Sequence, residues 1–271
     1  MDERLFPDPL VPGAFRVQFG ATAQSWVDPA RPDYLAFEYT QQIASVLEVV
    51  VMGRSEDERI RVVHVGGGGL SLPRWVEWRR PHSAQIVLEP DSELVAEVRR
   101  KLPLPRQSGI KVREVDGRAG IAAMPGGYAD AVIVDAFAEA QVPAELATAE
   151  WFGDVARVLR PGGIIVMNLT DSAPFSWGRR AVAGIASVLR HVVVGAEPAV
   201  FKGRRFGNLV VTASAARLPV RELARAASGG SFPYRVLSGR EASGWVGGAV
   251  PFSDASSEAS PRPAGRHFWF A

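Results

Sequence analysis

The sequence predicts an α/β protein with a mostly parallel seven-stranded sheet, helices on both faces, and a small N-terminal β-hairpin and helix extension. Three observations support this prediction. Short runs rich in β-branched residues alternate with longer segments of helical periodicity. Four consecutive glycines, Gly66 to Gly69, join the first such run of the sheet to a helix. Acidic residues stand at the ends of several predicted strands, which is where ligands of such sheets bind.

Residues 1–54 are expected to form a proline-rich arm, a β-hairpin and a helix. Apolar residues alternate from Phe15 through Val17 to Phe19, which predicts a first strand, and residues 21–27 can return as a second. An isolated hairpin is marginally stable in water, so its apolar face must be covered. We therefore expect a homodimer in which a partner subunit covers this face.

Residues 55–215 are expected to form the main domain, which begins with the apolar strand Arg61 to Val65. The glycines follow, and Ser71 then caps a helix that has Pro73 in its first turn. Glycine lets backbone pass close to a ligand, and a helix N-terminus offers free N–H groups and a partial positive charge. The order of strand, glycine turn and helix therefore predicts a ligand-binding corner.

The rest of this domain continues the alternation of strand and helix. Prolines, glycines and acidic residues bound each segment. Residues 216–271 are expected to form a short helix, over residues 220–227, and a Gly-, Ser- and Pro-rich tail that covers a site or is partly disordered. The further strands are expected at 85–89, 111–115, 130–134, 164–169, 191–199 and 208–213, and the helices at 34–51, 91–101, 118–124, 144–159 and 174–190.

Composition excludes several classes of function. The 271 residues are 47% hydrophobic and 22% charged, as in an ordinary globular protein. The absence of cysteine excludes disulfides, thiolate zinc sites and a cysteine nucleophile. The four histidines are scattered without metal-ligand spacing, so we expect no metal.

Charge and hydropathy argue against nucleic-acid and membrane partners. The formal net charge is only +2, and the arginine pairs fall near predicted helix ends, where they favour solvent and the helix dipole. No apolar run approaches the length of a membrane span, and the N-terminus lacks the apolar core of a secretory signal. We expect no nucleic-acid partner, no membrane partner and a cytoplasmic location.

Three acidic residues follow the glycine turn at successive strand ends: Glu89, Asp116 and Asp135. A lone acid at such a position is often only a helix cap. Together they suit a nucleoside, with Glu89 accepting from ribose hydroxyls, Asp116 from an exocyclic amine, and Asp135 facing the reacting group. The chain lacks a Walker lysine, and its glycines only approximate the dinucleotide pattern. Carboxylates facing the ligand also suit a cationic sulfonium better than a pyrophosphate.

These motifs resemble the class I S-adenosylmethionine-dependent, Rossmann-like fold, and more specifically the spermidine synthase (polyamine aminopropyltransferase) family. The resemblance covers roughly residues 15–213. A hairpin carrying Gln24 before the first strand resembles the family's small N-terminal domain, and PFSD at 251–254 faintly resembles a motif near its C-terminus. The segments that resemble family motifs are HVGGGGLSLPRWV, LEPD, EVDGRAGI, VIVDAF and VLRPGGIIVMN.

The resemblance implies a thioadenosyl co-substrate, S-adenosylmethionine or its decarboxylated form, and no metal. It implies that Gln24 contacts this ligand and that Glu89 holds the ribose. It further implies that Asp116 takes the adenine amine and that Asp135 receives a proton from the attacking amine. Gly66, Gly67 and Gly68 form the ligand-binding turn, and Gly117 lies beside Asp116.

The sequence also departs from the family pattern. The family's glycine motif usually carries an aspartate that binds the ligand's amino group, and the matching position here is Gly68. A second aspartate of the catalytic loop, which helps to hold the polyamine, corresponds to Ala138. The acceptor pocket is therefore more apolar. The residues expected to line it are Tyr34 or Phe37 from the N-terminal helix region, Phe137, and Glu139 or Glu145 as compensating acids.

Three functions remain open at this point. The first is aminopropyl transfer to an amine other than putrescine, with Asp135 as the base. The second is methyl transfer to a less charged small-molecule acceptor, which the apolar loop after Asp135 favours. The third is a ligand-binding homologue without catalysis, because residues of the family pattern are missing.

Overall fold

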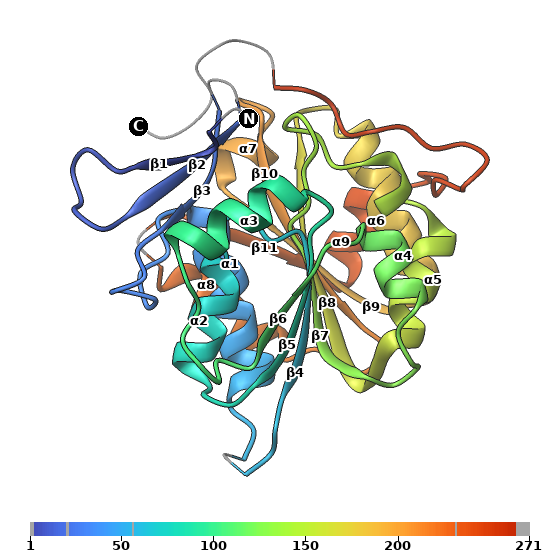
Figure 1. Cartoon of the computed structure of the whole chain (residues 1–271). Coiled ribbons are helices and arrows are strands. Elements are labelled where there is room, and N and C mark those ends of the chain that lie inside the picture. Colours follow the sequence, from blue (N-terminus) through green and yellow to red (C-terminus); the bar gives the residue numbers. More distant parts are fainter. Residues whose placement is uncertain (1–2, 20–21, 56, 231, 264–271) are drawn as a thin grey trace.

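Two β-sheets organise the chain (Figure 1). The computed structural model describes residues 3–19, 22–55, 57–230 and 232–263. The small sheet is antiparallel, and its central strand is β2. It contains β1 (Leu5–Pro7), β2 (Phe15–Phe19) and β3 (Thr22–Val27).

The large sheet has eight strands in the order β11-β9-β10-β8-β7-β4-β5-β6. The strands from β8 to β6 in this order run parallel, while β10, β9 and β11 add antiparallel pairs at one edge. The predicted fold class is thus confirmed, with one more strand than predicted. The strands are β4 (Arg61–Val65), β5 (Ala84–Leu88), β6 (Ile110–Arg113), β7 (Ala129–Val134), β8 (Leu159–Asp171), β9 (His191–Ala196), β10 (Gly207–Ser214) and β11 (Arg235–Ser238).

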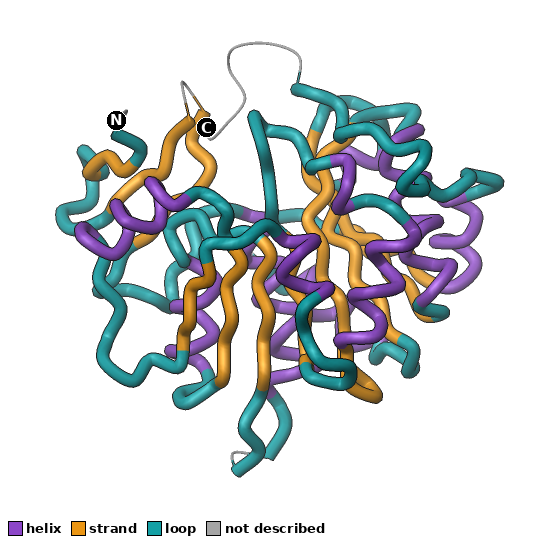
Figure 2. The backbone as a smooth tube through the Cα atoms, turned by 45° about the vertical axis from the view of Figure 1, so that its right-hand side comes forward, coloured by secondary structure: helices purple, strands orange, loops and turns teal. Residues whose placement is uncertain are grey.

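Helices cover both faces of this sheet (Figure 2). Neighbouring residues of β4 show why, since Val63 packs with α4, α5 and α6 on one face and Val62 packs with α1 and α2 on the other. The helices are α1 (Glu38–Leu47), continued as the π-helical η1 (Glu48–Met52), α2 (Ser71–Arg79), α3 (Ser92–Lys101), α4 (Gly117–Ala122), the 3-10 turn η2 (Ala144–Leu146), α5 (Ala149–Val158), α6 (Ser176–Val188), α7 (Pro198–Phe201), α8 (Val220–Ser228) and α9 (Gly239–Val246).

The small sheet packs against α3 and the glycine corner. Val17 of β2 is fully buried in a cluster with Leu70, Val98 and Leu102. The chain itself therefore covers Val17, which removes that residue from the surface expected to meet a partner subunit. The side chain of Phe19 lies outside the described part of the structure. The homodimer itself stays a prediction.

The C-terminal segment is more ordered than the sequence suggests. A loop or partly disordered tail was expected over residues 228–265, but β11 joins the edge of the large sheet beside β9, and α9 follows it directly. After α9, Phe252 is completely buried against Trp177. Gly, Ser and Pro dominate this part of the sequence, so its few apolar residues do not form a recognisable pattern. No described helix has the length and hydropathy needed to cross a membrane.

Candidate active site

A cleft opens at the carboxyl ends of β4, β5 and β7, with a volume of about 420 Å³. This is the edge at which open α/β sheets bind ligands. It brings together the predicted residues of the glycine turn, Glu89, Asp116, Gly117 and Asp135. The cleft is also lined by Ser25, His64, Phe137, Ala138, Glu139 and Glu145.

Gly66 fixes the join between β4 and β7. Its φ of +91° is a conformation that L side chains rarely adopt, and a Cβ there would lie 2.2 Å from the carbonyl oxygen of Asp135. Gly68 has a φ of +48°, and a Cβ there would lie 3.3 Å from Cβ of Ser25. The turn therefore brings the end of β4 against Asp135 on one side and against β3 on the other.

Glu89 follows β5 and turns its carboxylate toward the glycine turn. Oε2 accepts hydrogen bonds from the backbone N–H groups of Gly67, at 2.9 Å, and Gly68, at 3.4 Å. Oε1 accepts one from the N–H of Asp91 at 3.1 Å. Burial raises the pKa of Glu89, and the N–H groups of Gly67 and Gly68 oppose that effect. The backbone thus holds this carboxylate in one orientation.

Asp116 and Gly117 have structural roles that the sequence left open. The carboxylate of Asp116 accepts a hydrogen bond from the N–H of Ala119 at 2.8 Å, so it caps α4 while also lining the cleft. A Cβ on Gly117 would lie 2.3 Å from a methyl group of Val65, so close packing of α4 on β4 explains that glycine. Cap and ligand contact are compatible, because a carboxylate has further acceptor positions.

Asp135 follows β7 and is held by two side chains from other elements. Asn168 of β8 donates to Oδ1 at 2.9 Å, and the Tyr39 hydroxyl of α1 donates to Oδ2 at 3.3 Å. Burial raises the pKa of Asp135 to about 6, and the two hydrogen bonds oppose this effect. Burial and the nearby carboxylate of Asp135 also raise the pKa of Tyr39 well above its usual value.

The positioning network continues behind Asp135. Asn208 of β10 donates to the side-chain oxygen of Asn168 at 2.9 Å, so three elements fix the orientation of one carboxylate. The sequence analysis missed these residues. Tyr39 fitted the apolar stripe of its helix, while Asn168, which is 1% exposed, is a polar residue within an otherwise apolar strand. Asn168 could have been recognised from the sequence, because a buried amide side chain needs hydrogen-bond partners.

The loop after Asp135 forms an apolar wall with acids at its margin. Phe137 lines the cleft, and Ala138 stands where the family pattern has an aspartate. Glu139 also lines the cleft, but its carboxylate pairs with Arg262. The side chain of Glu145 lines the cleft and has no polar partner among the described residues. Glu145 is therefore the free carboxylate of this wall.

Two of the predicted site residues do not line the cleft, and the side chain of a third is not described. Tyr34 packs on Trp26 and Arg31 and does not line the cleft. Phe37 is buried against Tyr39 and does not line it either. The residue from this region that reaches Asp135 is instead Tyr39 of α1. The backbone of Gln24 belongs to β3, whereas its side chain lies outside the described part of the structure.

The cleft is rich in carboxylates and poor in cations. Among the described residues, one histidine, His64, lines the cleft. It is buried and hydrogen-bonded to Gln85 at 2.9 Å, and burial lowers its pKa to about 4, so it is neutral. The described residues contain no group of three or more His, Cys, Asp or Glu side chains arranged to hold a metal ion. The acidic residues that line the cleft are Glu89, Asp91, Asp116, Asp135, Glu139 and Glu145.

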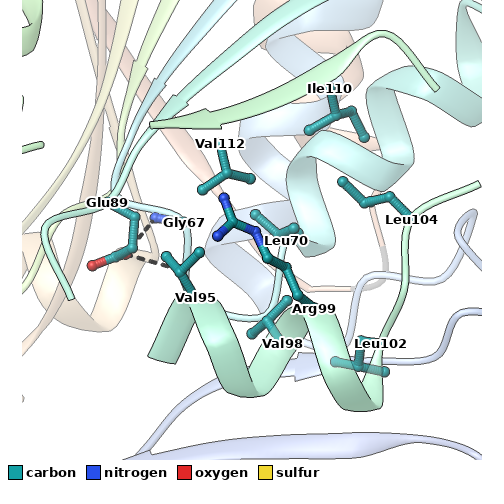
Figure 3. A pocket seen from close by; sticks show the side chains of 11 residues that line it. Gly67, Leu70, Glu89, Val95, Val98, Arg99, Leu102, Leu104, Ile110 and Val112 are labelled. Atoms are coloured by element: carbon teal, nitrogen blue, oxygen red, sulfur yellow. Dashed lines mark hydrogen bonds between the residues drawn. The ribbon is translucent and has the colours of Figure 1, made fainter. Parts of the chain in front are cut away.

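A second, apolar pocket of about 190 Å³ adjoins this cleft (Figure 3). It shares Gly67, Gly68 and Glu89 with the cleft, and its other walls come from α3 and β6. Arg99 extends into the pocket among apolar side chains, and its guanidinium pairs with Glu114 at 2.6 Å. The apolar residues are Leu70, Val95, Val98, Leu102, Leu104, Ile110 and Val112.

The chain is similar to proteins described as aminopropyltransferases. It is 27% identical over 148 residues to the polyamine aminopropyltransferase of Chromobacterium violaceum, and the match covers 54% of each chain. The chain thus matches about half the length of this curated relative. The crystal structure of a probable spermidine synthase from Corynebacterium glutamicum is 27% identical, covers 92% of both chains and superposes with a TM-score of 0.85. No model of a known protein family matches the chain.

More distant structures share the fold. Spermidine synthase from Thermotoga maritima is 14% identical, covers 90% of this chain and 79% of its own, and has a TM-score of 0.57. Human methyltransferase-like protein 13, solved with SAH, is 19% identical, covers 70% of this chain and 89% of its own, and has a TM-score of 0.58. The comparisons therefore confirm the resemblance of this chain to the spermidine synthase family, on a class I methyltransferase-like fold.

Proposed function

We propose that this chain is a spermidine synthase-like transferase. It binds S-adenosylmethionine or its decarboxylated form and transfers an aminopropyl group to an amine acceptor, with Asp135 as the base. The observation that carries the proposal is the setting of Asp135. Its carboxyl group has a pKa of about 6 and follows β7 in a cleft that also contains the glycine turn and Glu89.

The residues of the cleft fit a thioadenosyl nucleoside. A Cβ on Gly67 would lie 3.4 Å from Oε2 of Glu89, so any side chain there would fill the space in front of the carboxylate. Glu89 then accepts from the ribose hydroxyls, and Asp116 from the exocyclic amine. Ser25 lines the cleft beside Gly68, which brings β3, the strand of Gln24, next to the ligand. The excess of carboxylates favours a cationic sulfonium.

In the proposed reaction the protein forms no covalent bond to either substrate. The sulfonium supplies an electrophilic carbon, to which the acceptor nitrogen bonds while the carbon–sulfur bond breaks and its electron pair stays on sulfur. The cleft orients the two partners in line, and Asp135 accepts the proton that the nitrogen loses. A pKa of about 6 leaves Asp135 ionised at neutral pH, yet more basic than an ordinary aspartate.

The acceptor is an amine with fewer cationic ends than putrescine. Desolvating a second ammonium group requires a carboxylate or carbonyl partner. Ala138 provides none, and Arg262 already neutralises Glu139. Phe137 offers apolar surface in the same wall. Glu145 remains as one free carboxylate, which suits an acceptor with a single distal charge or none.

Methyl transfer from S-adenosylmethionine is a second candidate function. The observation that favours it is the apolar run Ala136, Phe137 and Ala138, which borders the reacting position and lines the cleft. The same cleft residues hold the nucleoside in both functions. The two differ in which carbon of the sulfonium meets the acceptor.

Calorimetry with S-adenosylmethionine, its decarboxylated form and methylthioadenosine tests the proposal. Preference for the decarboxylated form, with a labelled aminopropyl group appearing on the acceptor by mass spectrometry, supports it. Preference for the parent and a mass gain of one methyl group supports the second candidate. Binding of none of the three compounds rejects both enzymes.

The variant Asp135→Asn tests the proposed base. We expect turnover to fall by about 100-fold or more, while affinity for methylthioadenosine changes little. The exposed Asp33→Asn is the matched control and should turn over like the wild type. Full turnover by Asp135→Asn would exclude this carboxylate as the base.

A further inference from the structure

A second large cavity lies beside the opposite ends of the strands from Asp135. Its volume is about 690 Å³, and its walls come from α6, α8, α9 and the start of β9. The register places it there, because His191 pairs with Ser214, and Ser214 pairs with Ile164 at the start of the parallel part of β8. Asp135 follows the far end of β7. The cavity is therefore separate from the proposed active site.

The charged side chains that line this cavity are all basic. Arg190, Arg217 and Arg221 line it together with His191, and no aspartate or glutamate within the described part of the chain does. None of the three arginines has a hydrogen bond or ion pair to another described side chain. Glu222 follows Arg221 on α8 but does not line the cavity. The cavity is thus a concentration of uncompensated positive charge.

Several other arginines around the sheet are paired with carboxylates. Arg54 and Arg160 pair with Asp130, Arg118 pairs with Asp254, and Arg205 pairs with Glu197. Arg190, Arg217 and Arg221 are exposed, so solvent can reach all three guanidinium groups. Positive charge gathered around one hollow attracts anions, and the arginine cluster therefore suits an anionic ligand.

The floor of the cavity is apolar. Val182, Val193, Leu218, Ala242 and Val246 contribute to it, so the cavity combines an apolar body with a few polar groups at its margin. That combination and a volume of several hundred cubic ångströms are typical of small-molecule sites. Arginine favours phosphate because its planar guanidinium donates two parallel hydrogen bonds.

We propose that this cavity is a binding site for a small phosphorylated ligand with an apolar or aromatic body, such as a nucleoside diphosphate. Arg190, Arg217 and Arg221 hold the phosphates, and the valines and leucine of the floor contact the body. The site does not depend on the proposed transfer reaction, since it shares no residue with the cleft of Asp135.

Calorimetry of the full chain with ADP tests this proposal, with adenosine and inorganic pyrophosphate as partial probes. ADP should bind with one-to-one stoichiometry, pyrophosphate more weakly, and adenosine not detectably. The triple variant Arg190→Gln, Arg217→Gln, Arg221→Gln should weaken ADP binding at least about tenfold, because each lost charged hydrogen bond costs about that much. Circular dichroism and the melting temperature establish that the variant is folded.

Two controls make the test specific. Arg225→Gln removes a charge from α8 one turn after Arg221, at a position outside the cavity, and should leave ADP affinity unchanged. Glu89→Gln alters only the cleft and should do the same. An equal loss of ADP affinity in Arg225→Gln would show that general surface charge causes the effect. A loss of ADP affinity in Glu89→Gln would show that ADP binds in the cleft. If the chain binds single-stranded RNA with an affinity that rises with RNA length, the ligand is nucleic acid and not a small molecule. Each of these three outcomes, or no binding of ADP at all, overturns the proposal.

Discussion

The hydroxyl of Tyr39 lies 3.3 Å from Oδ2 of Asp135, joining α1 to the end of β7 across 96 positions of sequence. With Asn168 on the other oxygen, both oxygens of the carboxylate have a donor. A carboxylate held in this way keeps one orientation. As the proposed base, Asp135 would have to release or share one of these hydrogen bonds when an amine approaches. Tyr39 is the more weakly held of the two donors, so it is the one we expect to yield.

The variant Tyr39→Phe should move the acidic limb of the pH–rate profile to higher pH. The hydrogen bond from Tyr39 lowers the pKa of Asp135, which burial has raised to about 6. Its loss raises this pKa further, so at pH 6 a smaller fraction of Asp135 is ionised and the rate falls about two- to fivefold. Rates measured from pH 5 to 9 check this. Tyr128→Phe, before β7, is the control, and an unmoved limb would contradict the assignment.

Asp135→Asn should stabilise the folded protein at pH 8 but not at pH 4. The pKa of Asp135 is raised from 3.8 to about 6, so ionisation of this group opposes folding above pH 6. That cost disappears as the pH falls from about 6 to below 4, because the carboxyl group is then neutral in both states. At 1.36 kcal/mol per unit, the gain at pH 8 is at most about 3 kcal/mol. Urea unfolding at both pH values measures it, and an equal gain at pH 4 would count against burial as the cause.

The variant Gly66→Ala should disrupt the corner between β4 and β7. Its Cβ would lie 2.2 Å from the carbonyl oxygen of Asp135, in addition to the positive φ. We expect the free energy of unfolding to fall by about 3 kcal/mol or more. Gly127→Ala separates the two effects, because Gly127 also has a positive φ, +65°, with no atom within 4 Å of the added Cβ. That control should lose only about 1 kcal/mol, and equal losses would show that the contact with Asp135 is unimportant.

Glu89→Gln should weaken the binding of methylthioadenosine by about 10- to 100-fold. The substitution keeps the size of the side chain but removes the charge that strengthens hydrogen bonds from ribose hydroxyls, a difference of about 1.5–3 kcal/mol. Glu93→Gln on the exposed side of α3 serves as the reference. Unchanged affinity in calorimetry would mean that Glu89 only closes the glycine turn through Gly67 and Gly68.

Phe252→Ala should lower the free energy of unfolding by about 3–5 kcal/mol, as expected for an aromatic side chain in a core. Phe252 is completely buried, with Trp177 on one side and the guanidinium of Arg180 at 3.9 Å from its ring. Val250→Ala, two residues earlier and 71% exposed, should cost almost nothing. Similar denaturation midpoints for the two variants would mean that this segment is peripheral to the fold.

The sequence was most informative where local chemistry and topology agree. Gly66 and the β-branched strand before it fix the corner, and parallel strands then place Glu89 and Asp135 at the same edge. Tyr39 was not predicted as a site residue, because helical spacing says which face it is on but not that its hydroxyl reaches another element. For Asn168, the only indication of a role in the site was its polar side chain within an otherwise apolar strand.

The C-terminal segment shows a different limit. The strand β11 has four residues, and pairing with β9 supplies the hydrogen bonds that make it a strand. Local composition around it, rich in glycine, serine and proline, favours a loop. Nonlocal pairing of this kind leaves little trace in a single sequence, which is why β11, the eighth strand of the sheet, was not predicted.

The segment around Ser260 holds a loop that lies far earlier in the chain. Its hydroxyl accepts a hydrogen bond from the N–H of Val142, 118 positions earlier, and Arg262 pairs with Glu139 in the loop that carries Phe137. During synthesis, the loop that shapes the acceptor wall emerges long before the residues that hold it. The part of the cleft around Glu89 can therefore form first, and the proposed acceptor wall is completed only when this distant segment docks.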